Sequence, residues 1–102
     1  MIGYLSGRLL AADGEELLVA AGGVGYWVTV GAHDARAVMK SAERAVELFV
    51  HTQMTVAATT GKATIHLYGF RTPEDLEAFR WVLSVPKLGA RIALDLVGTL
   101  GA

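Results

Sequence analysis

The stretch "AGGVGYWVTV", Ala21 to Val30, decides between two kinds of fold. Three glycines lie within four residues, and strand-forming residues follow them. A glycine-rich loop that binds a dinucleotide lies between a strand and a helix, because the helix N-terminus holds the pyrophosphate. Here Gly25 is followed by Tyr-Trp-Val-Thr-Val, which favours a strand. The stretch therefore predicts bulge or bend glycines at a junction between two barrel strands, and no phosphate site.

The remainder of the first seventy residues predicts further strands and one short helix. Residues 32–45 are rich in helix formers, and His33-Asp34 suits a helix start. Ala11–Gly14 and Thr59–Lys62 are turn signals. Apolar, β-branched and aromatic segments predict five strands, at Ile2–Leu10, Leu17–Ala21, Tyr26–Val30, Leu48–Val56 and Ala63–Phe70. Five short strands with a helix between the third and fourth are typical of an OB-type barrel.

After residue 70 the apolar pattern changes to a helical period. Thr72 suits an N-cap, and Pro73 suits the first helical position. Apolar residues that are expected to pack follow at Leu76, Phe79, Trp81, Val82 and Leu83. Val85–Gly89 interrupts this helix, and a second helix is predicted from Arg91. Its buried face is predicted to contain Ile92, Leu96 and Leu100.

The predicted fold class is therefore mainly β with a C-terminal α segment. A five-stranded OB-fold barrel is expected over residues 1–70, followed by a helix–hairpin–helix segment over residues 71–102. The second segment is short for a complete domain, so we interpret it as a truncated or reduced one.

Composition limits the classes of function. Nine Lys and Arg stand against ten Asp and Glu, so the basic excess that usually accompanies nucleic-acid binding is missing. Any positive charge that contacts DNA must then be local or concentrated by assembly. The chain has no cysteine, which excludes disulfides and thiolate metal sites. It has no apolar run that could span a bilayer and no secretory signal at its start, so a soluble cytoplasmic protein without membrane contact is expected.

Residues that could carry out catalysis or bind a metal are scattered. The three histidines have no carboxylates at ligand spacing, and the serines have no base partner nearby in the sequence; they are His33, His51, His66, Ser6 and Ser84. We therefore expect no catalytic residue, no metal and no cofactor. The acidic turn formed by Asp13, Glu15 and Glu16 is interpreted as solvated surface.

Three segments together resemble one protein family. They are "MIGYLSG" at Met1–Gly7, "GGVGYWV" at Gly22–Val28 and "LYGF" at Leu67–Phe70, and the helix "TPEDLEAFRWVLSV" follows. Their order and separation resemble RuvA, the bacterial Holliday-junction-binding family that works with the RuvB motor. The resemblance covers nearly the whole chain, is strongest in the first and last barrel strands, and is weak over Ala32–Ala45.

The resemblance implies an architecture larger than this chain. The family has an OB barrel, a middle domain with two helix–hairpin–helix motifs, and a third domain that engages RuvB. Only the barrel and one hairpin fit into 102 residues, so a fragment, an engineered truncation or a reduced relative is expected. The implied partners are branched DNA and further copies of the chain, as a homo-oligomer and most simply a tetramer. Without the docking domain, this chain alone is expected not to stimulate a RuvB-type motor.

The resemblance also implies a DNA-binding hairpin, formed by Lys87, Leu88, Gly89, Ala90 and Arg91. In the family, two glycines flank a hydrophobic residue so that backbone N–H groups face a phosphate at a helix N-terminus. Lys87 takes the first glycine's place, and if that position needs a positive φ, lysine is strained there by about 1 kcal/mol. Arg91 lies where the family has a lysine. "RIALDL" from Arg91 also resembles the helix after the family's second hairpin, so a join between distant segments is an alternative.

The tip of the long hairpin departs from the family. An acidic pair there, the acidic pin, repels phosphates at the junction centre. The corresponding tip of this chain has no carboxylate and one lysine; it is formed by Ala58, Thr59, Thr60, Gly61 and Lys62. The resemblance therefore does not extend the pin function to this chain.

The resemblance implies a non-enzymatic module that binds four-way DNA junctions in recombination and repair, through phosphates and shape. One alternative is an assembly module with little DNA affinity of its own. A second is a generic single-strand-binding OB domain. This second alternative requires Tyr26 or Trp27 to be exposed on a basic groove, whereas an alternating strand predicts that one of them faces the core.

Overall fold

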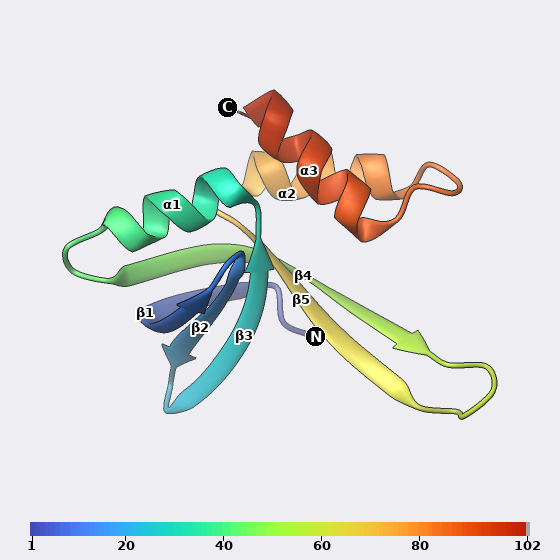
Figure 1. The fold of residues 1–102 in the computed structure, drawn as a ribbon, viewed down its shortest axis with the longest axis horizontal. Helices are drawn as coiled ribbons and strands as arrows, with labels where there is room; N and C mark the ends of the chain where they lie inside the picture. The colour runs from blue at the N-terminus through green and yellow to red at the C-terminus, as the bar shows by residue number, and fades with distance from the viewer. Residues whose placement is uncertain (102) are drawn as a thin grey trace.

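The computed structural model describes residues 1–101 and is mainly β, with helices at its C-terminal end (Figure 1). In chain order the elements are β1 (Tyr4–Asp13), β2 (Glu16–Ala21), β3 (Val24–Val30), α1 (Ala32–Lys40), β4 (Ala45–Val56), β5 (Ala63–Phe70), α2 (Pro73–Leu83) and α3 (Ala90–Gly101). The five predicted strands and the helices that follow them are confirmed.

The strands form a closed barrel in the order β1-β2-β3-β5-β4. Four of the contacts between neighbouring strands are antiparallel, while β3 and β5 run parallel and pair only at Thr29↔Tyr68 and Val30↔Gly69. Beyond these two pairs β3 and β5 diverge, as the cyan and yellow strands of Figure 1 show. The barrel is therefore closed at one end of this seam and open at the other.

The glycines of the opening stretch make a tight hairpin turn. Gly22 and Gly23 have φ values of 58° and 81°, and they link the paired residues Ala21 and Val24. A two-residue hairpin turn of this kind requires positive φ at both central positions, which glycine adopts without strain. The predicted strand junction is confirmed. Of the two predicted roles, bulge or bend, these glycines form the bend, and the register shift between β1 and β2 lies elsewhere, between Leu9 and Ala11.

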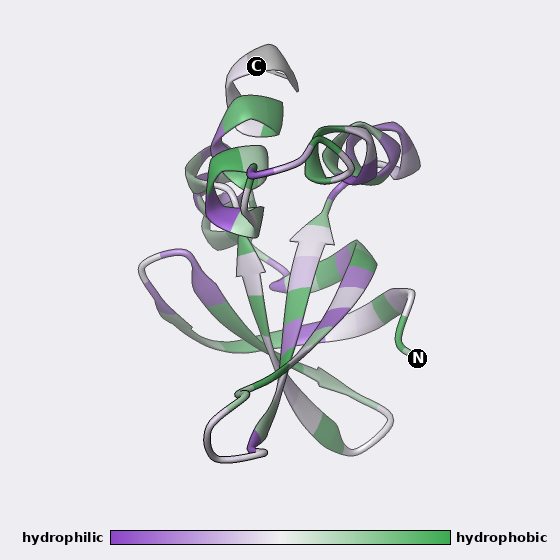
Figure 2. Cartoon of the chain, turned by 90° about the vertical axis from the view of Figure 1, so that its right-hand side faces the viewer, coloured by the Kyte–Doolittle hydropathy of each residue, from purple (hydrophilic) through white to green (hydrophobic). Residues whose placement is uncertain are grey.

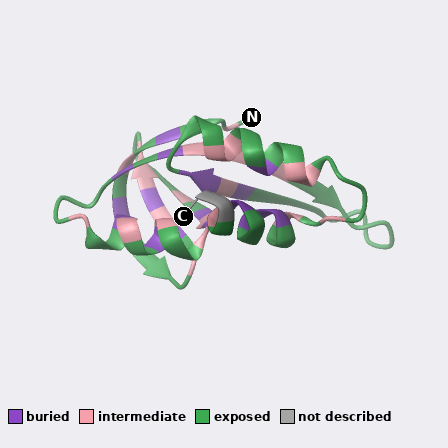
Figure 3. Cartoon of the chain, turned by 90° about the horizontal axis from the view of Figure 1, so that it is seen from above, coloured by how far each residue is buried: buried purple, intermediate pink, exposed green. Residues whose placement is uncertain are grey.

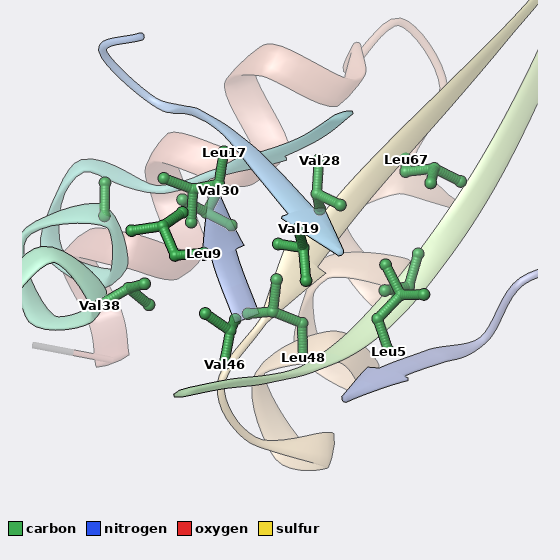
Figure 4. Close-up of a cluster of buried hydrophobic side chains, with 12 residues drawn as sticks. Leu5, Leu9, Leu17, Val19, Val28, Val30, Val38, Val46, Leu48 and Leu67 are labelled. Atoms are coloured by element: carbon green, nitrogen blue, oxygen red, sulfur yellow. The ribbon is translucent and has the colours of Figure 1, made fainter. Parts of the chain in front are cut away.

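The barrel core is apolar throughout. Among the described residues no polar or charged side chain is buried, and the cluster in Figure 4 includes Leu17, Val19, Val28 and Leu48, each 0% exposed. Alternation along β3 places Val28 inside and leaves Trp27 52% exposed. Tyr26 packs against the core, so the prediction that one of the two aromatic residues faces inward is confirmed.

Four strands extend beyond their predicted bounds, by one residue in β2, two in β3 and three in β1 and β4. β1 starts at Tyr4 and continues to Asp13, through most of the predicted turn, because Ala11, Ala12 and Asp13 pair with β2. β4 begins at Ala45, which pairs with Arg8 of β1. Ladder pairing with a neighbouring strand outweighs the weak strand propensity of alanine and aspartate.

The β4–β5 hairpin projects from the barrel. Its pairing continues to Val56↔Ala63, past the last contacts with β1 and β3, and this distal part is exposed (Figure 3). Met54, Val56 and Ile65 are 65%, 63% and 65% exposed. The projecting part is thus a two-stranded arm that has no core of its own.

The helices α2 and α3 pack around Phe79, which is 0% exposed. At the start of α2 the Asp75 N–H donates to Thr72 Oγ1 at 3.1 Å, which confirms the predicted N-cap. Buried partners come from the end of β5 and from α3, namely Phe70, Ala93, Leu94 and Val97. Figure 2 shows these helices above the barrel, with hydrophobic segments on both.

The buried face of α3 differs from the prediction. Ile92 and Leu96 are 50% and 42% exposed, while Ala93 and Leu94 face α2. Trp81, expected to pack, is 74% exposed. Apolar residues cover more than one side of α3, so sequence periodicity alone did not determine the buried side; contact with Phe79 did. The expectation for Leu100 concerns a side chain outside the described set.

Candidate nucleic-acid interface

The connection between α2 and α3 is a tight turn. Leu88 N–H donates to Val85 O at 3.2 Å, with Pro86 and Lys87 as the central residues. Lys87 has a φ of 73°. Proline followed by a residue of positive φ is the arrangement of a type II turn, in which the third position favours glycine. Lys87 therefore has the positive φ at which a lysine side chain is expected to be strained.

The α3 N-terminus follows this turn directly. Its first intrahelical bond runs from Ala93 N–H to Gly89 O at 3.0 Å. The N–H groups of Ala90, Arg91 and Ile92 precede that bond and have no earlier turn of helix to donate to. A side chain at Gly89 would meet no atom within 4 Å, so the space in front of this turn is open.

Arg91 already binds two carboxylates of its own chain. Its Nη2 lies 2.6 Å from Glu15 Oε1 and 3.2 Å from Asp95 Oδ1, and the hydrogen bond that Arg91 donates to Glu15 raises the pKa of Arg91. Both salt bridges found within residues 1–101 involve this guanidinium. The interpretation of Glu15 as solvated surface is wrong, because α3 brings Arg91 onto the β1–β2 turn.

Lys87 differs from Arg91 in its surroundings. It is exposed, and no ion pair among the described residues includes it. Leu88 is half-buried beside it. Of the two cations predicted for this hairpin, Lys87 is thus the one whose charge can meet an external anion without first leaving a carboxylate.

The tip of the β4–β5 hairpin is a separate candidate site. Ala57 and Gly61 close it through two backbone hydrogen bonds, from Ala57 N–H to Lys62 O at 2.9 Å and from Gly61 N–H to Ala57 O at 2.8 Å. Lys62 N–H also donates to Thr60 Oγ1 at 3.2 Å. The predicted tip residues Ala58 to Lys62 are all exposed and lie apart from the α2–α3 turn (Figure 1).

Trp27 has acidic surroundings. It lines a groove of about 370 Å³ together with Asp13, Glu16, Ile65 and His66. The single-strand-binding alternative required an aromatic residue on a basic groove. Carboxylates beside Trp27 repel a phosphate backbone, so the structure does not support that alternative.

Within residues 1–101, no three His, Asp or Glu side chains gather in a way that could hold a metal ion. His51 accepts a hydrogen bond from Arg80 Nε at 3.3 Å. Its pKa is lowered by desolvation and by the charge of Arg80. No helix in the described part of the chain combines the length and apolarity needed to cross a membrane.

Comparison with known proteins identifies the family. The model of the RuvA N terminal domain matches residues 1–69. The chain belongs to the RuvA family. Proteins named Holliday junction branch migration complex subunit RuvA from Halothermothrix orenii and Rubrobacter xylanophilus are 34% and 37% identical to it, each over 98% of this chain and 47% of the relative. The RuvA protein of Paraburkholderia xenovorans is 40% identical over 95% of this chain and 47% of its own length.

The chain spans about half the length of the curated RuvA relatives that it matches. The similarity to those relatives continues past the family model into α2 and α3, since it covers nearly all of the chain.

Two residues at the candidate interface were missed by the sequence analysis. Asp95 lies four residues after Arg91, a spacing at which opposite charges meet on a helix, so it was accessible from the sequence. Glu15 lies 76 positions away from Arg91, and no local pattern indicates their contact.

Proposed function

We propose that this chain is a non-enzymatic DNA-binding module that binds four-way junctions through backbone phosphates and shape. Its membership of the RuvA family over nearly its full length carries the proposal. The relatives are named as subunits of a Holliday junction branch migration complex, and the chain corresponds to about half of their length. The proposal is therefore restricted to junction binding.

We further propose that the barrel is of the OB type and that α2, the turn and α3 form a helix–hairpin–helix. The strand order β1-β2-β3-β5-β4 with a helix between β3 and β4 supports the first assignment. Two buried clusters support a division near residue 70, one inside the barrel and one around Phe79. The proposed units are residues 1–70 and residues 71–102.

The proposed contact with DNA is the α2–α3 turn. A phosphate oxygen placed before Gly89 would face the N–H groups of Ala90 and Arg91 and the positive end of the helix. Lys87 adds an unpaired charge beside them. Such contacts reach phosphates and not base edges, so binding is expected to depend on branch shape and little on sequence.

An assembly module is the second candidate, and the ion pairs of Arg91 favour it. A guanidinium held by Glu15 and Asp95 must leave two carboxylates before it binds phosphate. Apolar side chains are also exposed on the helices, including Trp81 at 74% and Ile92 at 50%. Exposed apolar surface favours association between copies. We propose a homo-oligomer, most simply a tetramer, and light scattering showing only monomer at high micromolar concentration contradicts that proposal.

The deciding experiment measures binding to a four-way junction, a duplex and a single strand, at about 50 and about 200 mM salt. Preference for the junction supports the proposal. Replacing both Lys87 and Arg91 by Ala is expected to weaken binding equally across junction sequences and to reduce the salt slope, since each neutralised phosphate adds roughly 0.9 to that slope. Lys40→Ala, a change of one exposed lysine on α1, serves as the charge control. Unchanged binding by the double variant moves the assignment to the assembly module.

A further inference from the structure

The open end of the barrel seam forms a groove between β3 and β5. We call it the β3–β5 groove and define it by Asp13, Glu16, Trp27, Thr29, Ile65 and His66. A pocket that continues it toward α3 shares four of these residues, Asp13, Glu16, Thr29 and His66, and each pocket measures about 370 Å³. The groove exists because the two strands pair at only two positions and then diverge, as Figure 1 shows.

Both walls of this groove present unpaired strand edges. Val24–Val28 pairs with β2 along one edge, and its other edge has no strand partner among residues 1–101. Ala63–Leu67 pairs with β4, and its edge toward β3 is likewise without a partner strand in the described chain. Free N–H and C=O groups along an exposed edge are what an added strand binds.

The side chains along the groove define the chemistry of an occupant. Asp13 and Glu16 are exposed carboxylates on the lip, and neither belongs to an ion pair among the described residues. Trp27 and Ile65, 52% and 65% exposed, supply apolar contact surface from opposite walls. Arg91 lines the pocket that continues the groove, and Glu15 and Asp95 already pair with its guanidinium.

We propose that the β3–β5 groove binds an extended, basic peptide segment of a partner protein, which adds as a strand to the free edge of β3. Backbone hydrogen bonds to Val24–Val28 hold the segment. Lysine or arginine side chains of the segment pair with Asp13 and Glu16, and its apolar side chains cover Trp27 and Ile65. Phosphate is repelled by the same carboxylates, so peptide binding in the β3–β5 groove does not depend on the proposed DNA contact, although the pocket that continues the groove reaches Arg91.

The test uses a labelled peptide of about nine residues that alternates lysine and valine, together with its glutamate–valine counterpart. Fluorescence anisotropy is expected to show saturable binding of the lysine peptide, with a dissociation constant below about 1 mM, and binding at least about tenfold weaker for the glutamate peptide. Hydrogen exchange of the Val24–Val28 amides is expected to slow when the lysine peptide is present. Absence of saturable binding, or equal binding of both peptides, overturns the proposal.

Paired variants separate the groove from general charge attraction. Asp13→Asn combined with Glu16→Gln is expected to weaken binding of the lysine peptide by about fivefold or more at low salt. Glu74→Gln combined with Glu77→Gln removes the same charge from the exposed side of α2 and is expected to leave peptide binding unchanged. Equal losses in both pairs, or bound peptide without protection of the β3 amides, show that the lysine peptide is attracted nonspecifically and overturn strand addition.

Discussion

Two tight turns of this protein both contain positive φ angles, but one has glycine at these positions and the other has lysine. The β2–β3 turn places Gly22 and Gly23 at φ 58° and 81°, where glycine carries no strain. The α2–α3 turn places Lys87 at φ 73°, where a side chain is strained. In the β2–β3 turn, the residue type is the one that stability alone would favour. In the α2–α3 turn, the residue type conflicts with the backbone conformation. Such conflicts concentrate at functional sites, where a requirement other than stability determines the residue.

The largest expected effect on stability concerns the β2–β3 turn. Replacing both Gly22 and Gly23 by Ala places two side chains at positive φ and is expected to lower the free energy of unfolding by about 2 kcal/mol or more. Urea denaturation measures the loss. Gly3→Ala is the matched control, because it adds a methyl group in open space without a positive φ and is expected to change little. Equal stability of the double variant and the control contradicts the assigned turn geometry.

At the α2–α3 turn, a substitution is expected to change the free energy of unfolding in the opposite direction. Lys87→Gly is expected to raise the free energy of unfolding by about 1 kcal/mol, because glycine relieves the positive φ. Lys87→Ala removes the same charge and keeps the strain, so it is expected to give no such gain.

The same pair of variants reports on DNA contact. Lys87→Gly is expected to bind junctions more tightly than the parent, since several backbone N–H bonds to an anion outweigh one flexible ammonium. Weaker binding by both Lys87→Gly and Lys87→Ala means that Lys87 itself is the contact and that this hairpin has changed mechanism.

A smaller effect concerns the ion pair that links the barrel to α3. Glu15→Gln is expected to lower the free energy of unfolding by less than about 1 kcal/mol, because the pair is largely solvent-exposed. The same change releases Arg91 and is expected to strengthen junction binding. Glu16→Gln removes an equal charge from the neighbouring position without releasing Arg91, so gel shifts of the two variants separate the ion pair from net charge. Equal gains from both variants contradict a specific restraint of Arg91 by Glu15.

The smallest expected effect is a pH dependence. His51 has a pKa below its usual 6.5, because it is partly desolvated and lies beside Arg80. The unfolded chain then binds more protons than the folded one as the pH falls below 6.5, so His51 lowers stability progressively down to its folded-state pKa. Urea denaturation at a series of pH values measures this fall. His51→Gln is expected to flatten the fall, and an unchanged slope contradicts the assignment to His51.

The sequence predicted most of the elements but fewer of their contacts. The five strands, the Thr72 cap and the packing of Phe79 follow from local pattern and were confirmed. Ile92 and Leu96 were assigned to a buried face because they fit a helical period, and Trp81 was expected to pack, yet all three are exposed. A helix with apolar residues on several sides has more than one possible buried face, and only its neighbours select among them.

The candidate site likewise has features that the sequence predicted and features that it did not. The sequence by itself determined the glycine turn, the strand-forming segments, the absence of a carboxylate from the hairpin tip and the presence of Lys87 in the α2–α3 turn, because each depends on a few adjacent residues. Only the tertiary structure placed Glu15 against Arg91 and separated β3 from β5 beside Trp27. Contacts between residues distant in the chain depend on how the barrel closes and on where α3 packs, and neither leaves a periodic signal in the sequence.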